Sequence, residues 1–433
     1  MGNLLRFDRR RQPDDRGRTA AGVYVDPRCR RILAASVHAR GRGFETIADV
    51  VADAAAALPG AVTDRFNRLV SALSGKESAS VSELLATINV DLAKATCDVL
   101  SEIQGKAPPG SGRFLVVAVE FPELRFRAAQ RVRAIEPCDP AFLAEATGMN
   151  IVDAFTRRDI ACGGHGGPLH AIPEWLLLRD RRFDRVMLYL GPTVHLTYLP
   201  HGRDATFANR ILSFDAGPGV DMLDPLASRL TAGRERSDDG GRLAAQGCRL
   251  EPLLTHWLAD PYFESPLPRW QPRGVSAERF LGDAFEMAIR RDWSIRDLLC
   301  TATHFIAEVS ARAVYRHVPL KSGSDRPIQI VVAGEGRKNG MLLREISARL
   351  PEFSVRRIED IGFPDKALRP ASTAVLGLMH LDQTPANSPS VTGVDVARVL
   401  GRLTPGNPQN HQRLLVCLGG TTPAVRPLRG AVG

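Results

Sequence analysis

Strand-like apolar stretches alternate with stretches of helical periodicity along the whole chain. Phe114–Val119 and Ile328–Ala333 have the length and composition of buried strands. Across Leu84–Ile103, by contrast, apolar residues recur every three or four positions, which predicts an amphipathic helix. Ile295–His317 predicts a second long helix. This alternation favours layered α/β architecture over an all-β fold or a helical bundle.

Further elements follow from shorter patterns. Gly22–Val25 and Arg31–Ser36 predict two strands around a turn, and Val186–Leu190 with Val194–Leu199 predicts a hairpin. The alanine-rich stretch Thr46–Leu58 predicts a helix.

With 433 residues, the chain is longer than one hydrophobic core usually supports, so two lobes with a cleft between them are expected. Residues 1–18 are Arg-rich with few apolar side chains and predict a disordered tail. We expect a first α/β lobe over residues 19–148. A second lobe over residues 149–433 would carry a catalytic loop and a nucleotide-binding corner.

Composition excludes several classes of protein. The chain is 44% hydrophobic and 24% charged, which is ordinary for a globular protein. No apolar stretch approaches the roughly 20 residues of a membrane helix, and no signal peptide begins the chain, so a cytoplasmic protein without membrane contact is expected. The net charge is +9, but arginines and acids are interspersed, which argues against nucleic-acid binding.

The cysteines are scattered and no pair has the spacing CxxC. This pattern indicates free thiols in a reducing compartment, with neither a zinc site nor a disulfide framework. We therefore predict no protein-bound structural metal.

The most unusual segment is Arg157–Leu169, in which four of the five positions 163–167 are glycine. Glycine adds no packing but lets a backbone approach a ligand closely, so a ligand loop is predicted, with a flexible surface connection as the alternative. Asp159 lies between arginines and isoleucine in this segment. It is either a surface ion-pair partner or a general base.

Two other segments carry weaker signals. Phe214–Gly219 ends in Gly-Pro-Gly before a helical stretch, and backbone N–H groups at such a turn can hold a phosphate or a sugar oxygen. Val331–Asn339 is a strand followed by Gly-x-Gly, a pattern typical of nucleotide-binding corners but common elsewhere.

Five segments, taken in order, resemble the anhydro-N-acetylmuramic acid kinases. They are DPAFLAEATG (139–148), RRDIACGGHGGPL (157–169), FDAGPG (214–219), ADPYF (259–263) and NSPSVTG (387–393). The resemblance covers residues 139–403 well and the first lobe weakly. It implies an actin-like sugar-kinase ATPase fold, with two ribonuclease-H-like lobes around a central cleft.

The resemblance also implies an activity. In that family a carboxylate activates water to open the ring of 1,6-anhydro-N-acetylmuramic acid, and the freed sixth oxygen takes the terminal phosphate of ATP, in the presence of Mg²⁺. This reaction belongs to the recycling of cell-wall sugars. Asp159 matches the base. The residues implied to contact the amino sugar are Arg157, Gly163, Gly164, His165 and Gly166, and those implied to contact the nucleotide are Gly191, Thr193, Asp215, Gly217, Gly219, Gly334, Gly336 and Asn339.

The sequence departs from the family at several positions expected to bind the phosphates of ATP. The family's first phosphate loop corresponds to Gly17–Gly22 here and lacks its aspartate, and a polar stretch of the first lobe has become Val119–Glu123. Pro192 removes a backbone donor, and Glu335 replaces a glycine and would repel phosphates. Weak ATP binding is therefore expected. An inactive relative that binds an amino sugar or a protein partner stays open as an alternative, and so does a homodimer.

Overall fold

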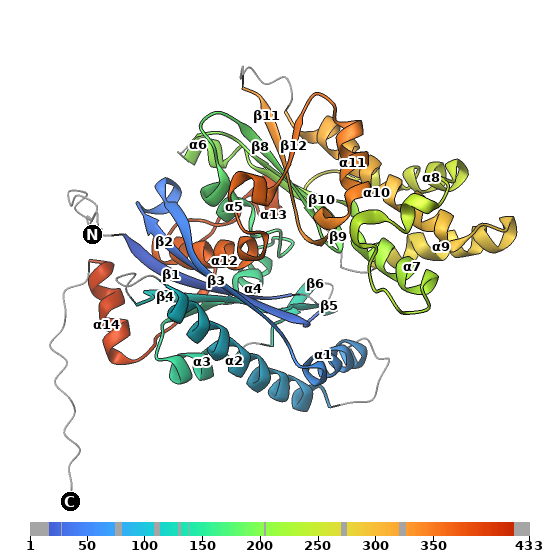
Figure 1. The fold of residues 1–433 in the computed structure, drawn as a ribbon. Helices are drawn as coiled ribbons and strands as arrows, with labels where there is room; N and C mark the ends of the chain where they lie inside the picture. The colour runs from blue at the N-terminus through green and yellow to red at the C-terminus, as the bar shows by residue number, and fades with distance from the viewer. Residues whose placement is uncertain are drawn as a thin grey trace, which may run out of the picture.

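The computed structural model describes residues 17–26, 28–73, 80–107, 113–128, 131–137, 139–202, 205–269, 275–319 and 326–419. Two main β-sheets, each flanked by helices, form the two lobes of the molecule (Figure 1). Most of the predicted N-terminal tail, residues 1–16, lies outside the described residues, and Arg18 already belongs to the first strand.

The first sheet has the strand order β13-β7-β4-β1-β2-β3. Strands β1, β2 and β3 form an antiparallel meander, β4 and β7 continue it in parallel with β1, and β13 closes the edge antiparallel to β7. The bounds are β1 (Arg18–Val25), β2 (Arg31–Arg40), β3 (Ile47–Ala57), β4 (Val116–Glu120), β7 (Ile151–Asp153) and β13 (Arg402–Thr404).

The second sheet has the order β10-β9-β8-β11-β12. Strands β8, β9 and β10 again form an antiparallel meander, and β11 and β12 follow in parallel on the other side of β8. The bounds are β8 (Asp184–Leu190), β9 (Thr193–Leu199), β10 (Leu212–Pro218), β11 (Ile328–Ala333) and β12 (Ser354–Arg357). Both sheets thus repeat one topology without a visible sequence repeat, which confirms the predicted fold of two ribonuclease-H-like lobes.

The helices bury both faces of both sheets. Helices α1 (Gly60–Leu73), α2 (Val81–Lys106) and α3 (Pro140–Thr147) cover the outer face of the first sheet. Helices α5 (Ala171–Leu178) and α12 (Asp365–Leu381) share one core with the facing sides of the two sheets. The outer face of the second sheet packs against α7 (Leu223–Leu230), α8 (Glu251–Leu258), α9 (Val275–Arg291), α10 (Ile295–His317) and α11 (Gly340–Arg349).

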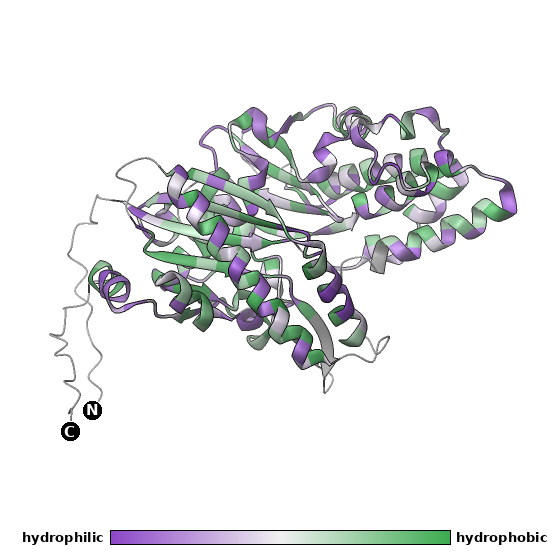
Figure 2. Cartoon of the chain, turned by 60° about the horizontal axis from the view of Figure 1, so that its bottom comes forward, coloured by the Kyte–Doolittle hydropathy of each residue, from purple (hydrophilic) through white to green (hydrophobic). Residues whose placement is uncertain are grey.

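The remaining elements are short or peripheral. They are the hairpin β5 (Leu124–Ala128) and β6 (Arg131–Ile135) and the helices α4 (Phe155–Ala161), α6 (Ala205–Ala208), α13 (Pro389–Thr392) and α14 (Pro408–Cys417). Figure 2 shows the expected distribution of hydropathy, with apolar strands inside and helices that carry polar residues outside. Within the described chain, no helix combines the length and apolar character needed to cross a membrane.

The prediction of a helix over Thr46–Leu58 was wrong, because this stretch is the strand β3. It pairs with β2 over its whole length, from Ile47 opposite Arg40 to Ala57 opposite Arg31. Alanine has the highest helix propensity, but intrinsic propensity is a small free-energy term, and pairing with a neighbouring strand outweighs it.

The boundary expected at residue 148 does not separate the two sheets. Strands β7 and β13 follow this position in the sequence but belong to the first sheet. Helix α12 also returns to the first lobe and packs against β1, β2 and β4. The second lobe is therefore inserted between segments of the first, and the chain crosses the cleft more than once.

Candidate functional site

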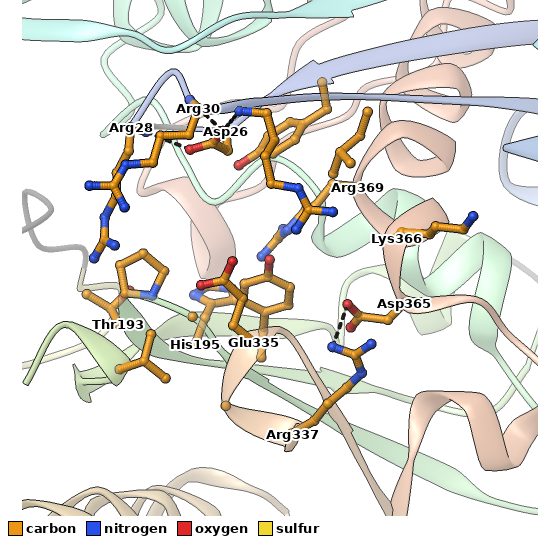
Figure 3. Close-up of a pocket in the computed structure, with 18 of the residues that line it drawn as sticks. Asp26, Arg28, Arg30, Thr193, His195, Glu335, Arg337, Asp365, Lys366 and Arg369 are labelled. Atoms are coloured by element: carbon orange, nitrogen blue, oxygen red, sulfur yellow. Dashed lines mark hydrogen bonds and ion pairs between the residues drawn. The ribbon is translucent and has the colours of Figure 1, made fainter. Parts of the chain in front are cut away.

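A cavity of about 1250 Å³ lies between the two lobes and collects residues from both sheets (Figure 3). The first lobe contributes the turn between β1 and β2 and the end of β4. The second lobe contributes the turn between β8 and β9 and the segment after β11. The glycine segment Gly166–Leu169, helix α7, residues 236–239 and the first half of α12 also line it.

The turn between β1 and β2 lies on the cavity wall, whereas the sequence had suggested residues Gly17–Gly22 for the phosphate loop. The suggested counterpart, Gly17–Gly22, was wrong, because from Arg18 onward it runs along strand β1. The cavity is instead lined by Asp26, Arg28 and Arg30, with Arg31 at the start of β2. The alignment with the family's phosphate loop was misjudged because the turn contains no serine, threonine or glycine.

Asp159, the predicted base, is fully buried and does not line the cavity. Its Oδ2 accepts the backbone N–H of Gly166 at 2.7 Å, while Oδ1 accepts Asn387 Nδ2 at 2.7 Å and Thr392 Oγ1 at 2.8 Å. A Cβ on Gly164 would lie 2.2 Å from Oδ2, so this glycine allows the loop to fold over the carboxylate. In the described conformation Asp159 fastens the glycine loop to the segment 387–392.

The other predicted sugar contacts are divided between the cavity and the surface. Gly166 lines the cavity, whereas Gly163, Gly164 and His165 do not. His165 is exposed, and its backbone N–H binds the carbonyl of Thr392 at 2.8 Å. Arg157 lines a separate, smaller hollow beside α4.

A polar network that the sequence did not reveal stands beside the glycine segment. His170 Nε2 lies 2.7 Å from Glu120 Oε2, and Arg369 donates to His170 Nδ1 at 2.7 Å. Since a guanidinium can only donate, Nδ1 is the acceptor and the ring proton sits on Nε2, directed at Glu120. Thr373 Oγ1 also donates to Glu120 Oε2, at 3.3 Å. The network places a carboxylate on the cavity wall in a fixed orientation.

Arg369 anchors this network. Its guanidinium lies 3.3 Å from Glu174 Oε1 and 4.1 Å from the ring centre of Tyr189. Burial lowers the pKa of Arg369, but Glu174, Tyr189 and Tyr24 more than compensate, so that its net pKa is raised. The side chain is therefore a permanent cation in the floor of the cleft.

On the second lobe, two glycine turns hold each other by backbone hydrogen bonds. Gly219 N donates to Pro192 O at 3.0 Å and Val220 N to Gly191 O at 2.9 Å. A Cβ on Gly219 would lie 2.2 Å from Gly191 O, so glycine is required for this approach. Gly191 and Thr193 line the cavity, whereas Gly217 packs against Val309 and Phe263, and Gly219 serves the contact between the turns.

The corner after β11 also has structural roles. Gly334 N donates to Asp365 Oδ1 at 2.6 Å, and Asn339 caps α11 by accepting Leu342 N at 2.9 Å. Gly336 and Asn339 line the cavity, but Gly334 does not. Glu335 also faces the cavity, and within the described residues no hydrogen bond or ion pair engages its carboxylate.

Asp215 lies in the middle of β10, lines the cavity and is held by a buried chain of polar groups. Its Oδ1 lies 2.9 Å from His195 Nδ1, His195 Nε2 lies 2.8 Å from Ser213 Oγ, and Ser213 Oγ lies 2.9 Å from Thr197 Oγ1. Ser213 is fully buried and does not line the cavity. This chain therefore orients Asp215 rather than presenting a nucleophile.

Comparison with known proteins identifies the family. The model of the anhydro-N-acetylmuramic acid kinase family matches residues 64–406, which is most of the chain. The chain belongs to this family. The kinase named for that sugar in Streptomyces avermitilis is 34% identical over 267 residues, covering 62% of this chain and 64% of that protein. The one in Acaryochloris marina is 32% identical over 264 residues, covering 61% and 68%.

The matched part of the chain spans about two thirds of the length of each of these two kinases. Among solved structures, a ROK family glucokinase from Streptomyces griseus with glucose and AMPPNP has 12% identity and a TM-score of 0.35, covering 83% of this chain and 98% of that one. Component A of the (R)-2-hydroxyglutaryl-CoA dehydratase of Acidaminococcus fermentans has 9% identity and a TM-score of 0.39, covering 83% and 96%. The family resemblance inferred from the five segments is confirmed by the family match.

The residue that directly follows β6, Glu136, carries a carboxyl group with a raised pKa. Burial, and then the charges of Glu123, Asp153 and Glu120, raise the pKa of Glu136 from 4.5 to about 8, against the opposite effect of Arg157. An acid whose pKa is higher in the folded than in the unfolded state contributes its full stabilisation when the pH is below the pKa of the unfolded state. This stabilisation is lost progressively as the pH rises from about 4.5 through 8.

We expect Glu136→Gln to remove this pH dependence, because the amide is neutral throughout. The melting temperature of the variant should equal that of the wild type near pH 5 and exceed it near pH 8. Thermal melts across that range, with Glu286→Gln on the exposed surface of α9 as a control, measure the difference. Parallel curves for the wild type and Glu136→Gln would show that Glu136 is not protonated in the folded state.

Proposed function

We propose that the protein is an ATP-dependent kinase that opens 1,6-anhydro-N-acetylmuramic acid with water and phosphorylates its sixth oxygen. The observation that carries this proposal is the cavity between the lobes, which joins the glycine segment Gly166–Leu169 to the second-lobe turns at Gly191–Thr193 and Gly336–Asn339. Sugar and nucleotide would thus meet between the lobes. The relatives named for this sugar support the choice of substrate.

The reaction requires a base for water and a site for the sugar. We assign the base to Asp159, as the resemblance implies. Because its carboxylate is buried under Gly164 and Gly166, the glycine loop must move before Asp159 can reach a water molecule. Sugar binding against the loop would supply the energy for this movement.

We assign Glu120 to the sugar. Its carboxylate is already on the cavity wall and is oriented by His170 and Thr373. A carboxylate in this position can accept a hydrogen bond from a sugar hydroxyl or from the acetamido N–H. Such a contact would fix the ring beside the glycine segment.

Mg²⁺ would accompany ATP rather than occupy a preformed site. In the parts of the chain that the structure describes, no group of three or more His, Cys, Asp or Glu side chains could hold a metal ion. Mg²⁺ commonly takes one or two carboxylates together with phosphate oxygens. Asp224 and Glu335 supply this type of donor on the second-lobe wall, and there Mg²⁺ would neutralise charge on the phosphates.

The test is an ADP-release assay with the full chain, ATP and Mg²⁺, in the presence and absence of 1,6-anhydro-N-acetylmuramic acid. Sugar-dependent release of ADP, with the 6-phosphate as product, is the expected result. We also propose a cytoplasmic location, because the proposed reaction consumes ATP. Binding of the sugar without ADP release would instead identify a relative that has lost phosphoryl transfer.

A further inference from the structure

Residues of the β1–β2 turn accept the hydrogen bonds of the turn's own backbone N–H groups. The carboxylate of Asp26 accepts the N–H of Arg28 at 3.0 Å, that of Arg30 at 2.9 Å and that of Arg31. Cys29 N donates to Asp26 O at 2.8 Å. The backbone N–H groups at positions 28–31 are therefore occupied, so they cannot bind an anion as a phosphate-binding nest does.

The turn is also anchored to the first lobe. Cys29 is fully buried, Thr63 Oγ1 donates to its carbonyl at 2.7 Å, and Leu58 N donates to Arg30 O at 2.8 Å. The arginine side chains consequently project from a fixed backbone. Figure 3 shows Asp26 under the turn and Arg28 and Arg30 on the side of the cavity opposite Thr193 and Glu335.

The three arginines have different surroundings. Arg28 forms ion pairs across the cleft with Asp221 and, at 3.6 Å, with Asp224. Arg30 and Arg31 line the cavity and are exposed, and the described residues provide no hydrogen bond or ion pair to either guanidinium. Two free guanidinium groups on a cavity wall match an anion with several oxygens, since each can bind a phosphate through two parallel N–H bonds.

We propose that Arg30 and Arg31 bind the terminal phosphates of the nucleotide, so that side-chain cations in this turn take the place of backbone donors. This inference rests on the proposed use of ATP. Arg28, by pairing with Asp221 and Asp224, holds the turn against the second lobe. The phosphates would lie between this turn and the Gly191–Thr193 turn on the opposite wall.

The test compares ligands that differ only in their phosphates. Calorimetric titration of the full chain with AMPPNP, adenosine and inorganic tripolyphosphate is carried out on the wild type and on the double variant R30A/R31A. We expect the affinity for AMPPNP and tripolyphosphate to fall about tenfold or more, with a weaker dependence on salt, and any affinity for adenosine to stay unchanged. The affinity of R30K/R31K for these ligands should lie between those of the wild type and R30A/R31A, because lysine keeps the positive charge but lacks the planar guanidinium that donates two parallel hydrogen bonds.

Arg40→Ala is the matched control. Arg40 ends the same strand, β2, outside the cavity, and its nearest acid is Asp49 at 3.7 Å. Equal affinities of the wild type and R30A/R31A for both polyphosphates would overturn the inference, and so would a wild type that binds neither. Arginine-dependent binding of tripolyphosphate by a protein that releases no ADP with sugar would support the inference and refute the proposed kinase activity.

Discussion

Replacing Asp159 by asparagine should lower turnover by about 10² or more while the sugar still binds. The amide has nearly the same size, but it cannot take a proton from water. Asparagine also has one acceptor oxygen in place of two, so it cannot serve Gly166 N on one side and Asn387 with Thr392 on the other. We therefore expect a modest fall in melting temperature as well. The measurements are ADP release, calorimetric titration with the sugar, and thermal melts.

Glu120→Gln is the informative comparison for this experiment. If Glu120 only positions the sugar, the variant should raise KM for the sugar more than it lowers kcat. Turnover that survives Asp159→Asn but is abolished by Glu120→Gln would contradict our assignment and identify Glu120 as the base. Loss of sugar binding in Asp159→Asn, without any loss in the rate of the bound complex, would show that Asp159 only fastens the glycine loop.

The elements that could be predicted from the sequence are those that local patterns determine. Helix α10 and strand β11 have the predicted bounds, Ile295–His317 and Ile328–Ala333. The helix over Leu84–Ile103 is α2, and Ser80 caps it by accepting Glu83 N at 3.3 Å. Apolar periodicity and a capping residue are properties of neighbouring residues, so the sequence shows them directly.

The candidate site was predictable only in part, because its decisive contacts join distant segments. The partners of Asp159 at Asn387 and Thr392 lie 228 and 233 positions away, and His170 meets Arg369 at a separation of 199. The glycine pattern indicated a ligand loop but could not show that two of its members fold over a buried carboxylate. The arginine turn carried no recognisable motif, although three arginines within positions 28–31, where one predicted strand turns into the next, could have suggested a cationic turn.

Gly22→Ala should destabilise the first lobe by about 3 kcal/mol or more, a large effect for one methyl group. A Cβ at this position would lie 1.9 Å from Pro370 O and 2.4 Å from Ala374 N. Both atoms belong to the backbone of α12, and β1 is fixed between β2 and β4, so neither side can yield without separating the helix from the sheet. Gly60→Ala at the start of α1 is the matched control, since its Cβ would meet nothing within 4 Å. Melting temperatures and nucleotide titrations distinguish two roles for Gly22. If the variant melts like the wild type but loses nucleotide affinity, Gly22 belongs to a phosphate loop after all. If it melts at a lower temperature while the folded fraction still binds nucleotide, Gly22 serves the packing of the strand against the helix.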